Sequence, residues 1–231
     1  MDVTWALSGG VAWALSGAVA GLVAGGVARG VVHRVAVPAG APDRGCPVCG
    51  GRVGWTGRCC GRALGPPLEW FTAAVVALLA WRFAGRPELA AFAFLGVLGV
   101  VLALVDVAVH RLPDRLTLPA YPVLVALLGV AGDWAALGRA VLGCLALGGV
   151  YLVLGLARPG GMGMGDVKLA GVLGLALGWL GWPELVVGGA LAFVLLAGTS
   201  VVLLIARRIT VRDALAFGPF MLVGAMAVVA F

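Results

Sequence analysis

Apolar runs long enough to cross a lipid bilayer fill most of this chain, and they restrict its fold more than any other feature. A transmembrane helix needs about 20 apolar residues, with a usual range of roughly 17 to 25. Eight segments meet that rule and are predicted to be membrane-spanning helices, at roughly 6–28, 69–85, 89–109, 116–132, 136–157, 166–183, 185–206 and 214–231. The sequence therefore predicts an all-α polytopic membrane protein with about eight transmembrane helices.

Composition supports the same fold class. Hydrophobic residues make up 62% of the chain and charged residues only 11%, whereas soluble domains carry about 25% charged residues. The 38 glycines suit membrane helices that approach each other closely. No basic segment precedes the first apolar run, so we expect this run to be kept as a span rather than removed as a signal peptide.

Basic residues divide unevenly between the odd-numbered and the even-numbered connections that join the eight predicted helices. Of the 16 Lys and Arg residues, only Arg82, Arg86 and Arg139 fall in the even-numbered connections. The positive-inside rule then predicts both termini outside the cytoplasm, with Asp106 and Asp166 on the cytoplasmic side. This orientation also explains the net charge of +6 more simply than a nucleic-acid partner, so no nucleic acid is expected.

The longest connection divides the chain into three predicted parts. These are a first transmembrane helix at 1–33, a cytoplasmic loop at 34–68 and a seven-helix domain at 69–231. The loop is rich in Gly, Pro and Arg and holds four cysteines, Cys46, Cys49, Cys59 and Cys60. The fifth, Cys144, lies within an apolar run and is expected to be a buried small hydrophobic residue.

Two acids lie at the edges of apolar runs, where a carboxylate is costly unless it has a use. Asp106 comes one helical turn before the basic pair His110–Arg111, and Asp166 follows a glycine-rich segment at the start of a later span. Two such acids at one membrane face can share a partly hydrated pocket, in which one carboxyl keeps its proton. That pair supplies a base to activate water and an acid to protonate a leaving amine, as in aspartic proteolysis. The alternatives are structural: each acid caps the N-terminus of a helix, or it is a charge at the membrane edge that sets the topology.

The segment after Asp106 yields a further structural prediction. Pro113 is expected to end the helix that carries Asp106, because its ring clashes with the preceding turn and its nitrogen has no proton to donate. Asp114 is then expected in the short loop that follows. Lys168, two residues after Asp166, has two interpretations: it biases the ionisation of the acids, or it anchors a helix end at the lipid headgroups.

Several motifs together resemble the type IV prepilin peptidases, which are polytopic aspartic proteases. The segment Gly163–Met164–Gly165–Asp166, followed by Val167–Lys168–Leu169, resembles the GxGD motif of that family. Other segments resemble, in the family's order, its opening helix (21–34), the start and end of its cysteine loop (46–49 and 67–69), its first aspartate segment (106–117) and the start of its last helix (217–220). The resemblance covers nearly the whole chain.

This resemblance implies a function and its residues. Asp106 and Asp166 would be the catalytic aspartates, with an active-site loop formed by Gly163, Met164, Gly165 and Lys168. The implied reaction removes the basic leader of type IV prepilins or type II secretion pseudopilins after a glycine, at the cytoplasmic face of the bacterial inner membrane. Proteolysis of this type needs no cofactor.

Three features depart from the family pattern. Arg29 stands where the family usually has an asparagine, and Ala108 stands where many members have a second acid. Cys46 and Cys49 have the spacing of half a zinc site, but Cys59 and Cys60 are adjacent, so the other half is expected to be poorly formed. Zinc at Cys46, Cys49, Cys59 and Cys60 and a reduced, metal-free loop therefore both stay open.

A second activity also stays open. Many members of the family methylate the new N-terminus with S-adenosylmethionine, and the departures at Arg29 and in the cysteine loop affect the region associated with that activity. No glycine-rich nucleotide loop in the sequence supports a methyl-donor site independently. Other functions are a GxGD protease with a different membrane substrate, an acid-lined transporter, for which inverted repeats are missing, and an inactive subunit of a pilus or secretion machine.

Overall fold

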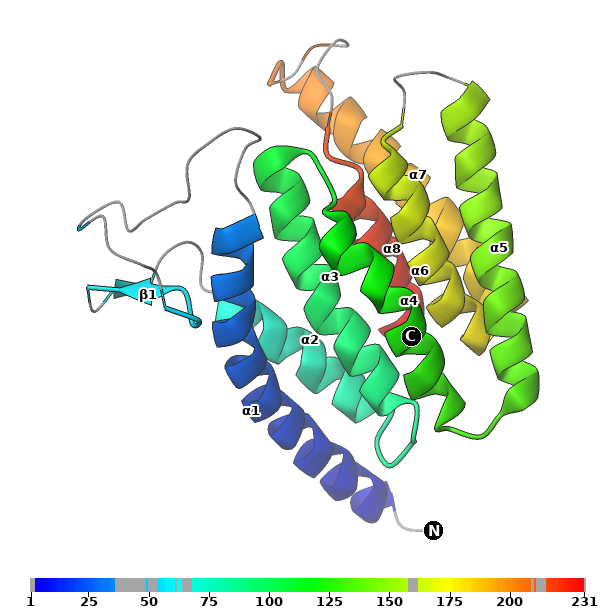
Figure 1. Cartoon of the computed structure of the whole chain (residues 1–231). Helices are drawn as coiled ribbons and strands as arrows, with labels where there is room; N and C mark the ends of the chain where they lie inside the picture. Colours follow the sequence, from blue (N-terminus) through cyan, green and yellow to red (C-terminus); the bar gives the residue numbers. More distant parts are fainter. Residues whose placement is uncertain are drawn as a thin grey trace. The chain divides into compact units, whose positions relative to one another are not determined.

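The computed structural model describes residues 3–35, 49, 54–60, 62–63, 68–157, 162–208, 210 and 215–230. This part holds eight helices and one antiparallel pair of two-residue strands (Figure 1). The helices are α1 Val3–Val35, α2 Leu68–Arg82, α3 Leu89–Val109, α4 Asp114–Gly129, α5 Trp134–Ala157, α6 Met164–Leu180, α7 Trp182–Ile205 and α8 Gly218–Ala230. The strands are β1 Arg58–Cys59 and β2 Arg62–Ala63. The chain divides into two compact units, Met1–Val109 and His110–Phe231.

The helices confirm an all-α membrane protein. Four of them, α1 over Gly9–Val35, α3, α5 and α7, are long and apolar enough to span a bilayer. The helices between them are shorter, with 15 residues in α2, 16 in α4, 17 in α6 and 13 in α8. Exposed tryptophans lie near helix ends, at Trp70, Trp81, Trp134 and Trp182, where the amphipathic indole ring suits the membrane interface.

In the first unit, α1 packs lengthwise against α2 through glycines. Gly17, Gly21 and Gly25 recur every four residues along one face of α1, and a Cβ at Gly21 would lie 2.6 Å from the Cα of Ala73. The Thr72 hydroxyl donates a hydrogen bond of 2.8 Å to the Gly21 carbonyl oxygen. Glycine is needed here because only a bare backbone lets the helices approach this closely.

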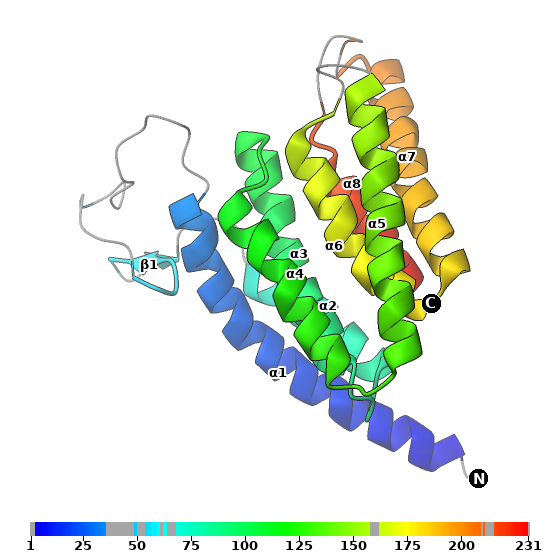
Figure 2. The same ribbon diagram turned by 45° about the vertical axis from the view of Figure 1, so that its right-hand side comes forward.

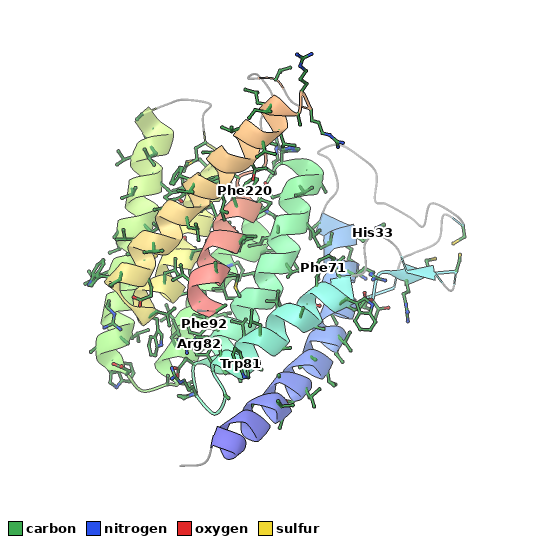
Figure 3. All side chains as sticks on the ribbon, turned by 180° about the vertical axis from the view of Figure 1, so that it is seen from behind. His33, Phe71, Trp81, Arg82, Phe92 and Phe220 are labelled. Atoms are coloured by element: carbon green, nitrogen blue, oxygen red, sulfur yellow. The ribbon has the colours of Figure 1, made fainter. Side chains whose placement is uncertain are left out.

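The two ends of α2 have different surroundings. Phe71 lies near its beginning, beside the end of α1 that carries His33, and Trp81 and Arg82 lie at its other end (Figure 3). Just past that end, the ring of Phe83 stacks on Phe92 of α3, with centroids 4.3 Å apart. This stacking closes the turn between α2 and α3.

In the second unit, α6 is the central helix and contacts α4, α5, α7 and α8 (Figure 2). All residues from Leu169 to Trp179 are buried, which explains why this segment is apolar on every face. Glycines again allow the closest approach: a Cβ at Gly174 would lie 2.5 Å from the Gly143 carbonyl oxygen of α5. The helix that carries Asp166 in its first turn therefore has more buried residues than any other helix of its unit.

The connection between α3 and α4 differs from the prediction. α3 ends at Val109, and His110 has a φ of 50°, a left-handed conformation that breaks the helix four residues before Pro113 is reached. Pro113 instead precedes α4 with a φ of −73°, and Asp114 is the first residue of that helix. The predictions that Pro113 ends the helix of Asp106 and that Asp114 lies in a loop were therefore wrong. An acid in the first turn of a helix is favoured by the helix dipole.

Candidate functional site

Asp106 lies in the last turn of α3, and its residue is only 5% exposed. It is the one buried acid in the described part of the chain. Val105 before it is fully buried, and Val107 after it is 58% exposed. The face of α3 that carries Asp106 is therefore a buried face. A buried carboxyl in a membrane helix is costly, which supports a functional use.

Asp166 lies in the first turn of α6 and is partly buried. Its Oδ2 accepts a hydrogen bond of 3.3 Å from the backbone N–H of Gly163, the residue before the helix. Helix N-terminal N–H groups and the helix dipole both stabilise a negative charge at this position. The capping use considered for this acid is therefore present in the structure.

Met164 and Gly165, expected in a loop before the helix, lie in the first turn of α6, and Gly163 is the residue before it. A Cβ at Gly165 would lie 2.9 Å from the Cβ of Leu112, so a larger residue would push the 110–113 segment away from the first turn of α6. Met164 projects outward and is 59% exposed. Gly160 and Gly161 lie outside the described residues.

Lys168 forms an ion pair with Asp114 and not with Asp166, the neighbour considered from the sequence. Its Nζ lies 2.6 Å from Oδ1 of Asp114 at the start of α4. The Tyr121 hydroxyl of α4 donates a hydrogen bond of 2.6 Å to the backbone carbonyl oxygen of Lys168. Asp114 and Tyr121 were not expected in the site. Positions two apart on a helix do not face each other, and that spacing could have separated Lys168 from Asp166 earlier.

The pairing of Asp106 with Asp166 joins the two units and stays a prediction. Asp106 belongs to the first unit and Asp166 to the second. Asp106 lies six residues before Leu112 in the sequence. Leu112 in turn lies against Gly165, the residue before Asp166.

A second candidate site is the group of cysteines at the β1–β2 hairpin. The Cys49 and Cys59 sulfurs lie 3.5 Å apart and the Cys59 and Cys60 sulfurs 3.8 Å apart, and all three lie within 4.8 Å of one another. Zinc–sulfur bonds of about 2.3 Å in a tetrahedral site place sulfurs at about these separations. Cys60, with a φ of 53°, bends the backbone so that adjacent Cys59 and Cys60 both lie near Cys49, and the quality of this half-site stays a prediction. Cys46 lies outside the described residues.

The hairpin is attached to the end of α1 by the residue that departs from the family pattern. Arg29 is buried and forms an ion pair with Glu69 at the start of α2. A Cβ at Gly57 would lie 2.5 Å from Cγ of Arg29, and the Arg34 guanidinium lies 4.0 Å from the centroid of the Trp55 ring. Arg29 therefore has a structural use that an asparagine, with its shorter neutral side chain, could not reproduce.

Comparisons with known proteins identify a family. Residues 92–206 match the model of the type IV leader peptidase family. The prepilin leader peptidase/N-methyltransferase of Klebsiella pneumoniae is 32% identical over 166 residues, which cover 62% of this chain and 72% of that protein. The protein of the same name from Burkholderia pseudomallei (strain K96243) is 33% identical over 214 residues, 82% of this chain and 67% of that protein. No solved structure matches. Because both aspartates lie inside the matched region and the similarity extends along most of these relatives, the chain belongs to the type IV leader peptidase family.

Proposed function

We propose that this protein is an intramembrane aspartic endopeptidase that removes the basic leader from type IV prepilins or related pseudopilins. The observation that carries the proposal is the presence of Asp106 and Asp166 in the matched region, each at the edge of an apolar helix. The relatives are named for prepilin leader cleavage. A membrane enzyme suits such a substrate, because a leader joined to an apolar segment meets the bilayer at its surface.

The proposed chemistry uses the two carboxyls as one acid and one base. Two like charges in close contact do not ionise together, so the pair shares a proton. The Gly163 N–H supports a negative charge on Asp166, which suits Asp166 to take the proton of the attacking water. Asp106 then gives its proton to the leaving amine as the peptide bond breaks, and transfer of a proton from Asp166 to Asp106 restores the starting state.

The proposed orientation puts this chemistry at the cytoplasmic face of the bacterial inner membrane. It is supported by the uneven distribution of Lys and Arg between the connections. Both termini then lie outside the cytoplasm, and the cysteine hairpin lies on the same side as the aspartates. A stable disulfide is not expected in that reducing compartment.

Cleavage of a prepilin by the purified protein tests this function. The full chain, in nanodiscs, is mixed with prepilin-like precursors encoded in the same genome, and the products are measured by mass spectrometry. We expect a leader that ends in glycine and a mature chain that begins with the next residue. An intact precursor, or a cut elsewhere in the chain, would contradict the proposal.

The same mass spectrum decides the methyltransferase activity that the relatives' name includes. With S-adenosylmethionine present, a mature chain heavier by one methyl group would show that the activity is retained. An unmodified amine would leave this chain with proteolysis alone.

We further propose that the cysteine hairpin binds zinc through Cys49, Cys59 and Cys60, with Cys46 as the fourth ligand by its sequence spacing. When bound, the ion would act as a structural cross-link. We expect about one zinc per chain in the purified protein and a loss of most of it in Cys59→Ser, because Cys59 lies between the other two sulfurs. Cys144→Ser, in α5, is the matched control and should keep its zinc. Wild-type protein without metal, purified without chelator, would contradict this assignment.

A further inference from the structure

The first turns of α6 are held at positions 165, 168 and 171 by α4 and by Leu112 just before it, and these contacts have a consequence for Asp166. We propose that Asp114, Tyr121 and Lys168 form a clamp that holds Asp166 in its reactive position. Asp114 and Tyr121 are positioning residues, since they act on Asp166 through the backbone of α6. This inference rests on the proposed function, because it assigns a task within the same site.

The three contacts lie on one stripe of α6. Gly165 lies against Leu112, Lys168 pairs with Asp114, and Gly171 lies against the hydroxyl of Tyr121. Positions 165, 168 and 171 are three residues apart and therefore share a face of the helix. Asp166 is turned about 100° away from Gly165 on a 3.6-residue helix. The clamp thus grips the helix on one face and leaves the carboxyl of Asp166 on another.

The ion pair and the tyrosine hold different parts of α6. The Lys168 ammonium lies 2.6 Å from the Asp114 carboxylate, and their side chains are 29% and 57% exposed. The Tyr121 hydroxyl donates to the carbonyl oxygen of the same lysine at 2.6 Å. No side chain fits at Gly171, because a Cβ there would overlap that hydroxyl. One contact therefore fixes the side chain of Lys168 and the other fixes its backbone.

The two roles of Lys168 suggested by the sequence explain these contacts less well than the clamp does. A lysine that biased the ionisation of Asp166 would need its ammonium beside that carboxylate, but it is bound to Asp114. A lysine that only anchored the helix in the headgroups would not need a tyrosine hydrogen bond to its own carbonyl oxygen. An ion pair with this exposure adds little stability by itself, whereas small displacements of a catalytic group cost much rate.

Steady-state kinetics of the full chain in nanodiscs test the clamp. We expect Asp114→Asn to lower kcat about tenfold and to change KM by less than about twofold. The expected loss of kcat is larger than the small effect of an exposed ion pair and smaller than the roughly 100-fold effect of a 1 Å misplacement. Tyr121→Phe, which removes only the hydroxyl, should lower kcat about threefold. Lys168→Met should match Asp114→Asn, and Lys168→Arg should restore most of the rate because it keeps the ion pair. Asp133→Asn is the matched control, since Asp133 is exposed and caps α5 through the N–H of Ala136.

A second measurement does not depend on activity. Hydrogen exchange in a peptide that covers 164–175 should be several-fold faster in Asp114→Asn and Tyr121→Phe than in Asp133→Asn. If both clamp variants match Asp133→Asn in kcat and in exchange while Asp166→Asn is inactive, the clamp is wrong and the proposed function stands. If Asp166→Asn cleaves normally, the function itself fails, whatever the clamp variants do.

Discussion

Asp106→Asn and Asp166→Asn should each lower kcat for prepilin cleavage by about 10³-fold or more, and each variant should still be recovered from the membrane. Asparagine has nearly the same shape as aspartate but can neither take a proton from water nor give one to the leaving amine. Because the pair works as a unit, the double variant should be no slower than the slower single variant. Precursor cleavage, followed by mass spectrometry, measures all three.

The control for this result separates chemistry from folding. Asp133→Asn in the same chain keeps a helix-capping oxygen and should keep its full rate. Asp106→Asn keeps the size of a side chain that is 5% exposed, so the midpoint of thermal unfolding should stay close to that of the wild type. A rate within tenfold of wild type for either single variant would contradict the assignment of that residue. If a variant loses both folding and activity, Asp→Glu, which keeps the carboxyl group on a longer side chain, replaces it in the test.

Gly174→Ala should destabilise the protein by about 2–3 kcal/mol, the cost expected when a tightly packed interface must accept an added methyl group. The new Cβ would lie 2.5 Å from the Gly143 carbonyl oxygen and 2.8 Å from the Cα of Cys144. Both atoms belong to the backbone of α5, so no side-chain rotation can relieve the overlap. Activity should fall with stability, because α6 carries Asp166 at its first turn.

Gly138→Ala provides the comparison for that substitution. Gly138 lies in α5, and nothing is within 4 Å of a Cβ placed there. Alanine has the higher helix propensity by up to about 1 kcal/mol, so this variant should be neutral or more stable. Thermal unfolding of the two variants in the same detergent measures the difference. Equal midpoints would contradict the close glycine contact between α5 and α6.

The sequence predicted the helices well because bilayer thickness sets the length of an apolar run. The segment 89–109 was predicted with the bounds that α3 has in the structure, Leu89–Val109. The end of α1 was missed by seven residues, since Val35 lies beyond a stretch that already contains His33 and Arg34. The left-handed conformation of His110 could not be foreseen, because residues other than glycine rarely adopt it.

The ion pairs around the two candidate sites could not be predicted from the sequence, because they join residues that are far apart along the chain. Asp114 and Lys168 are separated by 54 residues and Arg29 and Glu69 by 40, so no local pattern joins them. Arg29 was recognised as a departure from the family, but its partner Glu69 was interpreted only as the end of a loop. The two aspartates could be proposed from the sequence because a carboxylate next to an apolar run stands out without any tertiary information.

The account depends most on Asp106 and Asp166 facing each other, and a cross-link tests this directly. Asp106→Cys and Asp166→Cys are combined in a chain whose five native cysteines are replaced, and a short bis-thiol reagent is added in the native membrane. Peptide mass spectrometry should find the two positions linked within one chain, and should find no link when Asp133→Cys replaces Asp166→Cys. Failure of the 106–166 pair to link, with both thiols shown to be reactive, would contradict a catalytic pair of aspartates.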